Sequence, residues 1–117
     1  MSLDSLTTIA NTHDFDNTYT AEFENNVSGI TLITPTTGKS LKITGIFYNH
    51  EGASAAGNMT ALFLGSNTVA KLHPGTAPGS QNIEPFIVRG ARNQALTLTS
   101  NLGNGKSYYL AINYKEE

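Results

Sequence analysis

The last third of the chain alternates apolar and polar residues almost to its C-terminus, with turn-forming residues between the alternating runs. Residues 96–99 (LTLT) are followed by 101–105 (NLGNG) and then by 108–114 (YYLAINY). A period of two is the pattern of a half-buried strand. Asn104-Gly105 favours a tight hairpin turn, because both residues tolerate a positive φ. We therefore expect a C-terminal hairpin, and a chain that is built mainly of sheet.

The same alternation begins near Asn17, where Tyr19, Ala21 and Phe23 are expected to share one face of a strand. Residues 41–48 are partly apolar at both alternating sets of positions, with Leu41, Ile43, Gly45 and Phe47 on one face and Lys42, Thr44, Ile46 and Tyr48 on the other. This pattern predicts a central strand that is covered on both faces.

Further strands are expected over residues 29–34, 59–64, 68–72, 83–88 and 95–99. We expect a turn at 35–39, a turn at 65–67 that joins its two flanking strands in a hairpin, an exposed loop at 49–58 and a loop at 73–81. Pro85 predicts an edge or bulged strand at 83–88, because proline cannot donate to a sheet ladder. About eight short strands at spacings of about 8–15 residues are typical of two packed sheets. The expected fold is an all-β antiparallel β-sandwich of jelly-roll type that spans residues 17–117.

Residues 1–16 differ from the rest, since Leu3, Leu6 and Ile9 recur at helical spacing after a possible Ser2 cap. A helix of two turns is marginal alone in water and becomes ordered only by packing on something else. We expect these residues to form an N-terminal arm or short helix.

Composition excludes several classes of protein. Only 7 residues are Lys or Arg and the net charge is −2, so we expect no nucleic-acid partner. The chain has no Cys, which removes disulfides, thiolate nucleophiles and cysteine-based metal sites. No apolar run approaches the ~18 residues needed to cross a bilayer and no signal peptide is visible, so we expect no membrane partner.

The residues that could carry chemistry are sparse. His13, Asp14 and Asp16 form the densest set of possible metal ligands, but no closing acid follows them. His50-Glu51 and His73 lie in two separate loops. Residues 38–40 (GKS) superficially match a phosphate loop, yet no helix follows them, which indicates a turn. No nucleophile elbow is present. We expect no catalytic, metal or cofactor-binding residues and no enzymatic activity.

Tyrosines and arginines are the residues most suited to binding. Tyr108 and Tyr109 are successive strand residues and must point to opposite faces, so one packs inward and the other faces solvent or a neighbouring subunit. Arg89 and Arg92 flank Gly90, either as a surface pair or as an interchain contact. We expect these four residues to be candidates for a subunit interface.

Residues 29–114 resemble the small jelly-roll structural modules of tailed bacteriophages, which occur as head decoration proteins, head fibres and baseplate or tail-fibre domains. The resemblance rests on residues 34–46 (TPTTGKSLKITGI), 63–66 (FLGS), 88–90 (VRG) and 93–98 (NQALTL). It implies a β-sandwich that assembles as a homotrimer and attaches to a virion.

On this resemblance we expect a non-enzymatic capsid decoration, or cement, protein. It would be made in the host cytoplasm and bind the major capsid protein on the outer surface of the phage head. Leu3, Leu6 and Ile9 are the expected capsid-attachment residues. One alternative is a receptor- or glycan-binding module of a tail fibre or baseplate that uses loops 49–58 and 73–81, with Tyr48. Another is a small β-sandwich enzyme or a cupin-like metal protein, against which the lack of a His and Glu ligand motif counts.

Overall fold

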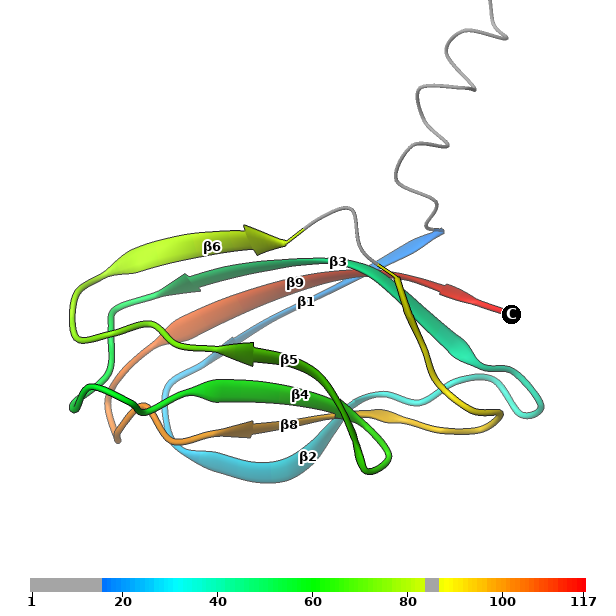
Figure 1. Cartoon of the computed structure of the whole chain (residues 1–117), viewed down its shortest axis with the longest axis horizontal. Coiled ribbons are helices and arrows are strands. Elements are labelled where there is room, and N and C mark those ends of the chain that lie inside the picture. The colour runs from blue at the N-terminus through cyan, green and yellow to red at the C-terminus, as the bar shows by residue number, and fades with distance from the viewer. Residues whose placement is uncertain (1–15, 84–86) are drawn as a thin grey trace, which may run out of the picture.

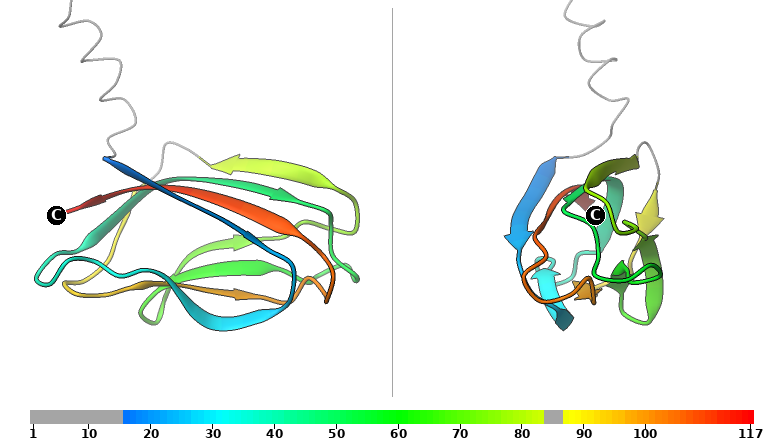
Figure 2. Two further views of the ribbon diagram at one scale, coloured as in Figure 1. Left: turned by 180° about the vertical axis from the view of Figure 1, so that it is seen from behind. Right: turned by 90° about the vertical axis from the view of Figure 1, so that its left-hand side faces the viewer.

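The computed structural model describes residues 16–83 and 87–117, and these residues form nine β-strands in two antiparallel sheets (Figure 1). The predicted antiparallel β-sandwich is therefore confirmed. Within the described residues, no helix is long or apolar enough to cross a membrane. The two sheets lie as separate layers when the molecule is seen from behind (Figure 2).

Each sheet takes its strands from distant parts of the chain. The first sheet has the order β1 (Asn17–Phe23), β9 (Tyr108–Glu116), β3 (Leu41–His50) and β6 (Gly79–Ile83), and β7 (Val88–Arg89) also pairs with β3. The second sheet has the order β2 (Val27–Ile33), β8 (Leu96–Ser100), β4 (Thr60–Leu64) and β5 (Asn67–Leu72). Most consecutive strands therefore lie in different sheets.

The hairpin predicted around residues 65–67 is confirmed. Leu64 pairs with Asn67, which leaves Gly65-Ser66 as a two-residue loop between β4 and β5. Gly65 has a φ of 61°. A positive φ at the first central position is characteristic of a type II′ turn, whose twist matches that of the two strands.

The predicted C-terminal hairpin is wrong. β8 pairs with β2 and β4 in the second sheet, whereas β9 pairs with β1 and β3 in the first. Residues 101–107 cross between the sheets, with Leu102 only 1% exposed in the core. Gly105 donates its N–H to the carbonyl oxygen of Glu24 at 3.1 Å, so this turn packs against the β1–β2 connection. The turn residues Asn104-Gly105 thus serve a crossing between sheets.

The central position of β3 is confirmed, but its two faces differ from the prediction. The pairing of β3 with β9 shifts register between Ile43 and Gly45, which marks a β-bulge. An extra residue reverses which side chains point inward beyond it. Tyr48 is consequently 0% exposed and lies in the core, while Phe47 is 38% exposed on the outer face.

The segment from 73 to 88 also differs from the prediction. Residues 79–81, which were expected to be a loop, belong to β6, and the single strand expected at 83–88 is replaced by the separate strands β6 and β7. Pro85 lies outside the described residues. The polar sequence of β6 (GSQNI) shows no apolar alternation, because this strand lies at an edge of its sheet and gains its order from pairing with residues 46–50 of β3.

The core fills the space between the sheets. It is formed by the inward residues of β3, β4, β8 and β9, joined by Ile33, Ala53, Leu72 and Leu102. The largest of the fully buried side chains are Tyr48, Leu41, Ile43, Ile46, Leu62, Leu64, Leu72, Leu96, Leu98, Leu102, Leu110 and Ile112. Tyr19 and Phe23 of β1 pack against this cluster, which confirms the predicted inward face of that strand.

The connection between β3 and β4 was expected to be exposed, but its first part is buried. Gly52 and Ala53 are both buried. The Ala53 N–H donates to the carbonyl oxygen of Gly75 at 2.7 Å, and the Ser54 N–H donates to that of Leu102 at 2.7 Å. The connection is therefore hydrogen-bonded to two other loops, the one that contains Gly75 and the one that contains Leu102.

Gly52 and Gly57 provide a matched test of this close packing. Both have a positive φ, 94° and 92°, but a Cβ at Gly52 would lie 2.7 Å from the backbone of Thr76, whereas a Cβ at Gly57 would meet nothing within 4 Å. We expect Gly57→Ala to cost about 1 kcal/mol of unfolding free energy through backbone strain. Gly52→Ala should cost a further ~1–3 kcal/mol through overpacking. Urea unfolding of both variants checks this, and equal losses would contradict the packing of the two loops.

Candidate functional site

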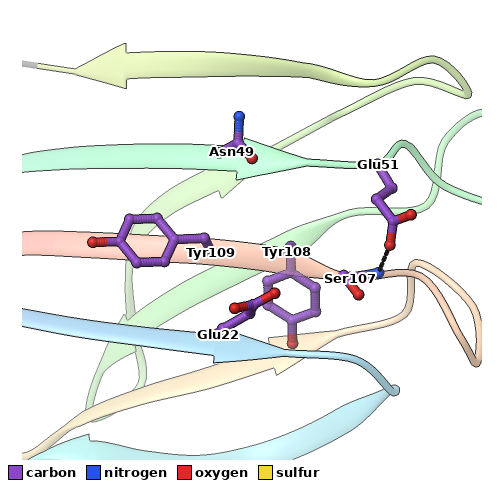
Figure 3. Close-up of a pocket in the computed structure, with 6 residues that line it drawn as sticks. All are labelled: Glu22, Asn49, Glu51, Ser107, Tyr108 and Tyr109. Atoms are coloured by element: carbon purple, nitrogen blue, oxygen red, sulfur yellow. Dashed lines mark hydrogen bonds between the residues drawn. The ribbon is translucent and has the colours of Figure 1, made fainter.

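The outer face of the first sheet carries a depression of about 350 Å³ near one end of the sandwich. It is lined by residues from β1, β3, β9 and the adjoining connections, namely Glu22, Asn49, Glu51, Ser107, Tyr108 and Tyr109 (Figure 3). Its lining is mostly polar, which distinguishes it from the apolar interior of the sandwich.

Strand register brings the central residues of this depression together. Tyr109 of β9 lies opposite Glu22 of β1 on one side and opposite Asn49 of β3 on the other. Residues directly opposite each other in antiparallel strands point to the same face. Since Tyr108 is buried in the core, these three neighbours project outward.

Glu51 closes one end of the depression. Its backbone N–H donates to the carbonyl oxygen of Ser107 at 3.1 Å, and the Ser107 N–H donates to Glu51 Oε1 at 2.7 Å. The hydrogen bond from the Ser107 backbone is the main cause that lowers the pKa of Glu51. Glu51 is therefore ionised at neutral pH, and one of its oxygens is held in a fixed position.

An aromatic pair lies beside these polar groups. The rings of Phe47 and Tyr109 meet edge to face, with centroids 6.3 Å apart and an interplanar angle of 64°. Edge-to-face contacts of this kind stabilise a defined ring orientation. In Figure 3 the Tyr109 ring lies along β9 with its face toward the viewer. The depression thus combines a held aromatic ring with carboxylate, amide and hydroxyl groups.

The structure separates the residues that were expected to form a subunit interface. Tyr108 is 2% exposed and stacks on Phe23 inside the sandwich, so only Tyr109 of this pair lies at the surface. Arg89 pairs with Glu117 at 3.1 Å, and Arg92 is exposed after β7. Arg89 lies opposite Lys42 of β3, whereas Tyr109 lies opposite Asn49 of the same strand. Lys42 and Asn49 are seven positions apart, which corresponds to roughly 20 Å along a strand. Tyr109 and the two arginines therefore belong to different patches.

The predicted capsid-attachment residues Leu3, Leu6 and Ile9 lie outside the described residues, as do His13 and Asp14. Asp16 is exposed, and its backbone N–H donates to the carbonyl oxygen of Tyr114 at 3.2 Å.

The two histidines that could have shared a metal differ in environment. His50 is 6% exposed, its Nδ1 accepts a hydrogen bond from the Gly52 N–H at 3.1 Å, and burial lowers its pKa. His73 is exposed. Within residues 16–83 and 87–117, no three His, Asp or Glu side chains come close enough to hold a metal ion.

The turn at 38–40 lies between strands, as predicted, with the Lys39 N–H donating to the carbonyl oxygen of Thr36 at 2.9 Å.

A polar cluster that the sequence did not indicate lies inside the sandwich. The hydroxyls of Tyr48 and Thr60 are hydrogen-bonded at 2.8 Å, and those of Thr60 and Ser100 at 2.9 Å. The Tyr108 hydroxyl is buried and has no hydrogen-bond partner among the described residues, although the nearby Ser100 hydroxyl offsets part of the rise that burial causes in its pKa. Tyr48, proposed as a glycan contact in the alternative function, belongs to this buried cluster.

Comparison of the chain with known protein families and with curated protein sequences finds no match. The residues of the depression that sequence reasoning missed are Glu22, Asn49 and Ser107. Each occupies an ordinary polar position in or beside a strand, and only the register across β1, β9 and β3 brings them together.

The buried tyrosines allow a paired test of the polar cluster. Tyr48→Phe removes a hydroxyl that is hydrogen-bonded to Thr60, and we expect a loss of about 1–2 kcal/mol in unfolding free energy. Tyr108→Phe removes an unpaired buried hydroxyl, and we expect an unchanged or slightly increased stability. Denaturant unfolding of the two variants measures both effects. A larger loss from Tyr108→Phe than from Tyr48→Phe would contradict the assigned hydrogen bonds.

Tyr48 also predicts a loss of stability at alkaline pH. Burial raises its pKa from 10.0 to about 12 in the folded protein. Between these values the unfolded chain releases the Tyr48 proton while the folded protein retains it, so stability falls as pH rises from about 10 to about 12. Unfolding free energies measured across this range should decline less steeply in Tyr48→Phe than in the unmodified protein. Equal slopes would show that Tyr48 is not protected from ionisation.

Proposed function

We propose that this protein is a non-enzymatic structural protein of a tailed-bacteriophage virion, and specifically a capsid decoration protein that binds the outer surface of the head as a homotrimer. The observation that carries the proposal is the strand order of the sandwich, taken together with the resemblance of residues 29–114 to phage jelly-roll modules.

The strand order supports a jelly roll. β6 and β7 both pair with β3 and together occupy one edge position of the first sheet, which leaves eight strand positions in two sheets of four. The only connection between consecutive positions that stays within one sheet is the β4–β5 hairpin. This order of eight strands in two packed sheets supports the proposed jelly roll, an arrangement that occurs in viral capsid domains.

The surface supports repeated contacts with other subunits. The first sheet ends on β1 and on β6 with β7, and the second ends on β2 and β5, so the described sandwich leaves strand edges that association can cover. Charged residues make up only 14% of the chain, and many outward positions of the second sheet are threonines, including Thr31, Thr97 and Thr99. Neutral polar faces of this kind suit the wet contacts of a repeating shell. A closed trimer satisfies both features.

The attachment role of the N-terminal segment can be tested by truncation. Removal of residues 1–15 spares Asp16, whose N–H donates to the carbonyl oxygen of Tyr114, and spares β1, which begins at Asn17. We expect the truncated chain to remain a folded trimer in analytical ultracentrifugation and to lose cosedimentation with phage heads that lack the protein. Full binding by the truncated trimer would refute attachment through this segment, and a monomeric full-length chain would refute the trimer.

A matched pair of variants separates the apolar residues from the segment as a whole. Leu3, Leu6 and Ile9 replaced together by Ser should abolish head binding, because the predicted apolar face is removed. Ser5, Thr7 and Thr8 replaced together by Ala should leave binding intact. Loss of binding in both sets would show that the apolar face is not the determinant.

A further inference from the structure

We propose that the depression formed by Glu22, Asn49, Glu51, Ser107 and Tyr109 is a binding site for a saccharide, with a pyranose ring seated on Tyr109 and its vicinal hydroxyls held by the surrounding polar groups. The proposal goes beyond head decoration. It concerns the outer face of the first sheet and involves none of residues 1–16. Its test is therefore independent of the test of capsid attachment.

The size and lining of the depression favour this class of ligand. A volume of about 350 Å³ lies at the lower end of the range for small-molecule sites, which suits one or two sugar rings. Most ligand pockets are largely apolar, whereas here carboxylate, amide and hydroxyl groups surround one aromatic ring. A ligand that fits must offer a small apolar face and many hydroxyls. A pyranose ring has both.

Tyr109 is held in place before any ligand arrives. It lies on β9, which is paired along its length with β1 on one side and with β3 on the other. Its ring is also oriented by the edge-to-face contact with Phe47. A ring that is already ordered loses little conformational entropy when a ligand stacks on it, which favours binding.

The polar groups around the ring are suited to vicinal hydroxyls. Glu51 uses Oε1 to accept the Ser107 N–H, so its side chain is held in place. A carboxylate has further lone pairs with which it can accept hydrogen bonds from a ligand. The exposed Glu22 carboxylate accepts from further hydroxyls. Among the described residues, the Asn49 side chain has one long contact, 3.5 Å from Nδ2 to the Gly79 carbonyl oxygen, so its amide can still donate and accept. Carboxylates and amides can each bond two neighbouring hydroxyls of one sugar.

A basic side chain is the main competing occupant, because two carboxylates line the site. Lys106 follows the turn beside Ser107 and already places a positive charge near Glu51, whose pKa it helps to lower. This charge reduces the local attraction for a second cation. The amide of Asn49 and the flat ring of Tyr109 serve a neutral polyol as well as they would serve a cation. We therefore favour the saccharide.

The test is a titration of the ¹⁵N-labelled full chain with methyl β-D-glucopyranoside, methyl β-D-galactopyranoside and methyl N-acetyl-β-D-glucosaminide, followed by NMR. We expect at least one glycoside to cause saturable shifts of the Asn49, Ser107 and Tyr109 amides. Tyr109→Ala should weaken this binding at least about tenfold, the equivalent of ~1.4 kcal/mol, while Tyr109→Phe should retain it. Glu51→Gln should also weaken binding by about tenfold while it keeps an oxygen for the Ser107 N–H.

Glu24→Gln is the matched control. Glu24 is an exposed carboxylate just after β1 that does not line the depression, so this variant should bind like the unmodified chain. Absence of saturable shifts with all three glycosides would overturn the proposal, as would binding that Tyr109→Ala leaves unchanged. Shifts of the same amides by N-acetyl-arginine amide, without shifts by any glycoside, would assign the site to a basic side chain and would equally overturn it. None of these outcomes bears on head binding by residues 1–16.

Discussion

The pairing of β3 with β9 is the contact on which the rest of this sandwich depends. The ladder runs from Leu41 opposite Glu116 to His50 opposite Tyr108, along nearly the whole of both strands. Its end is extended by two backbone hydrogen bonds between Ser40 and Glu117, at 3.0 and 2.9 Å. β9 then orders β1, and β3 orders β6 and β7. These partners lie far apart in sequence, so formation of the sheet requires the closure of long loops, which costs conformational entropy.

The bulge in β3 determines which side chains of this strand point into the core and which point to the outer face of the first sheet. Before the bulge Leu41 and Ile43 point into the core, and after it Ile46 and Tyr48 do so. A regular strand would have placed Tyr48 outside and Phe47 inside. The shift gives the core a tyrosine whose hydroxyl is bonded to Thr60, and it gives the outer face a phenylalanine that contacts Tyr109. The one extra residue in β3 therefore determines both that Tyr48 joins the interior polar cluster and that Phe47 contacts Tyr109 in the proposed saccharide site.

The proposed saccharide site and the proposed capsid-attachment segment lie in different parts of the chain and would serve two separate functions. The depression lies on a face that is fixed by three paired strands, where a rigid aromatic ring can be held. The proposed capsid attachment would use residues that precede the sandwich. A decoration protein with this division would present the outer face of its first sheet to solvent while the N-terminal segment binds the head. The two proposals are tested by different variants and different measurements.

Local rules in the sequence determined the β class, the β4–β5 hairpin, the inward face of β1 and the opposite orientations of Tyr108 and Tyr109. Each of these depends on the two-residue period of a strand or on the φ preference of a turn residue, both of which are properties of neighbouring residues. The tertiary structure alone decided that β8 and β9 belong to different sheets, that β3 is bulged, and that Glu22, Tyr109 and Asn49 form one row. Strand partners and register are chosen by packing between segments distant in sequence, and no local pattern specifies them.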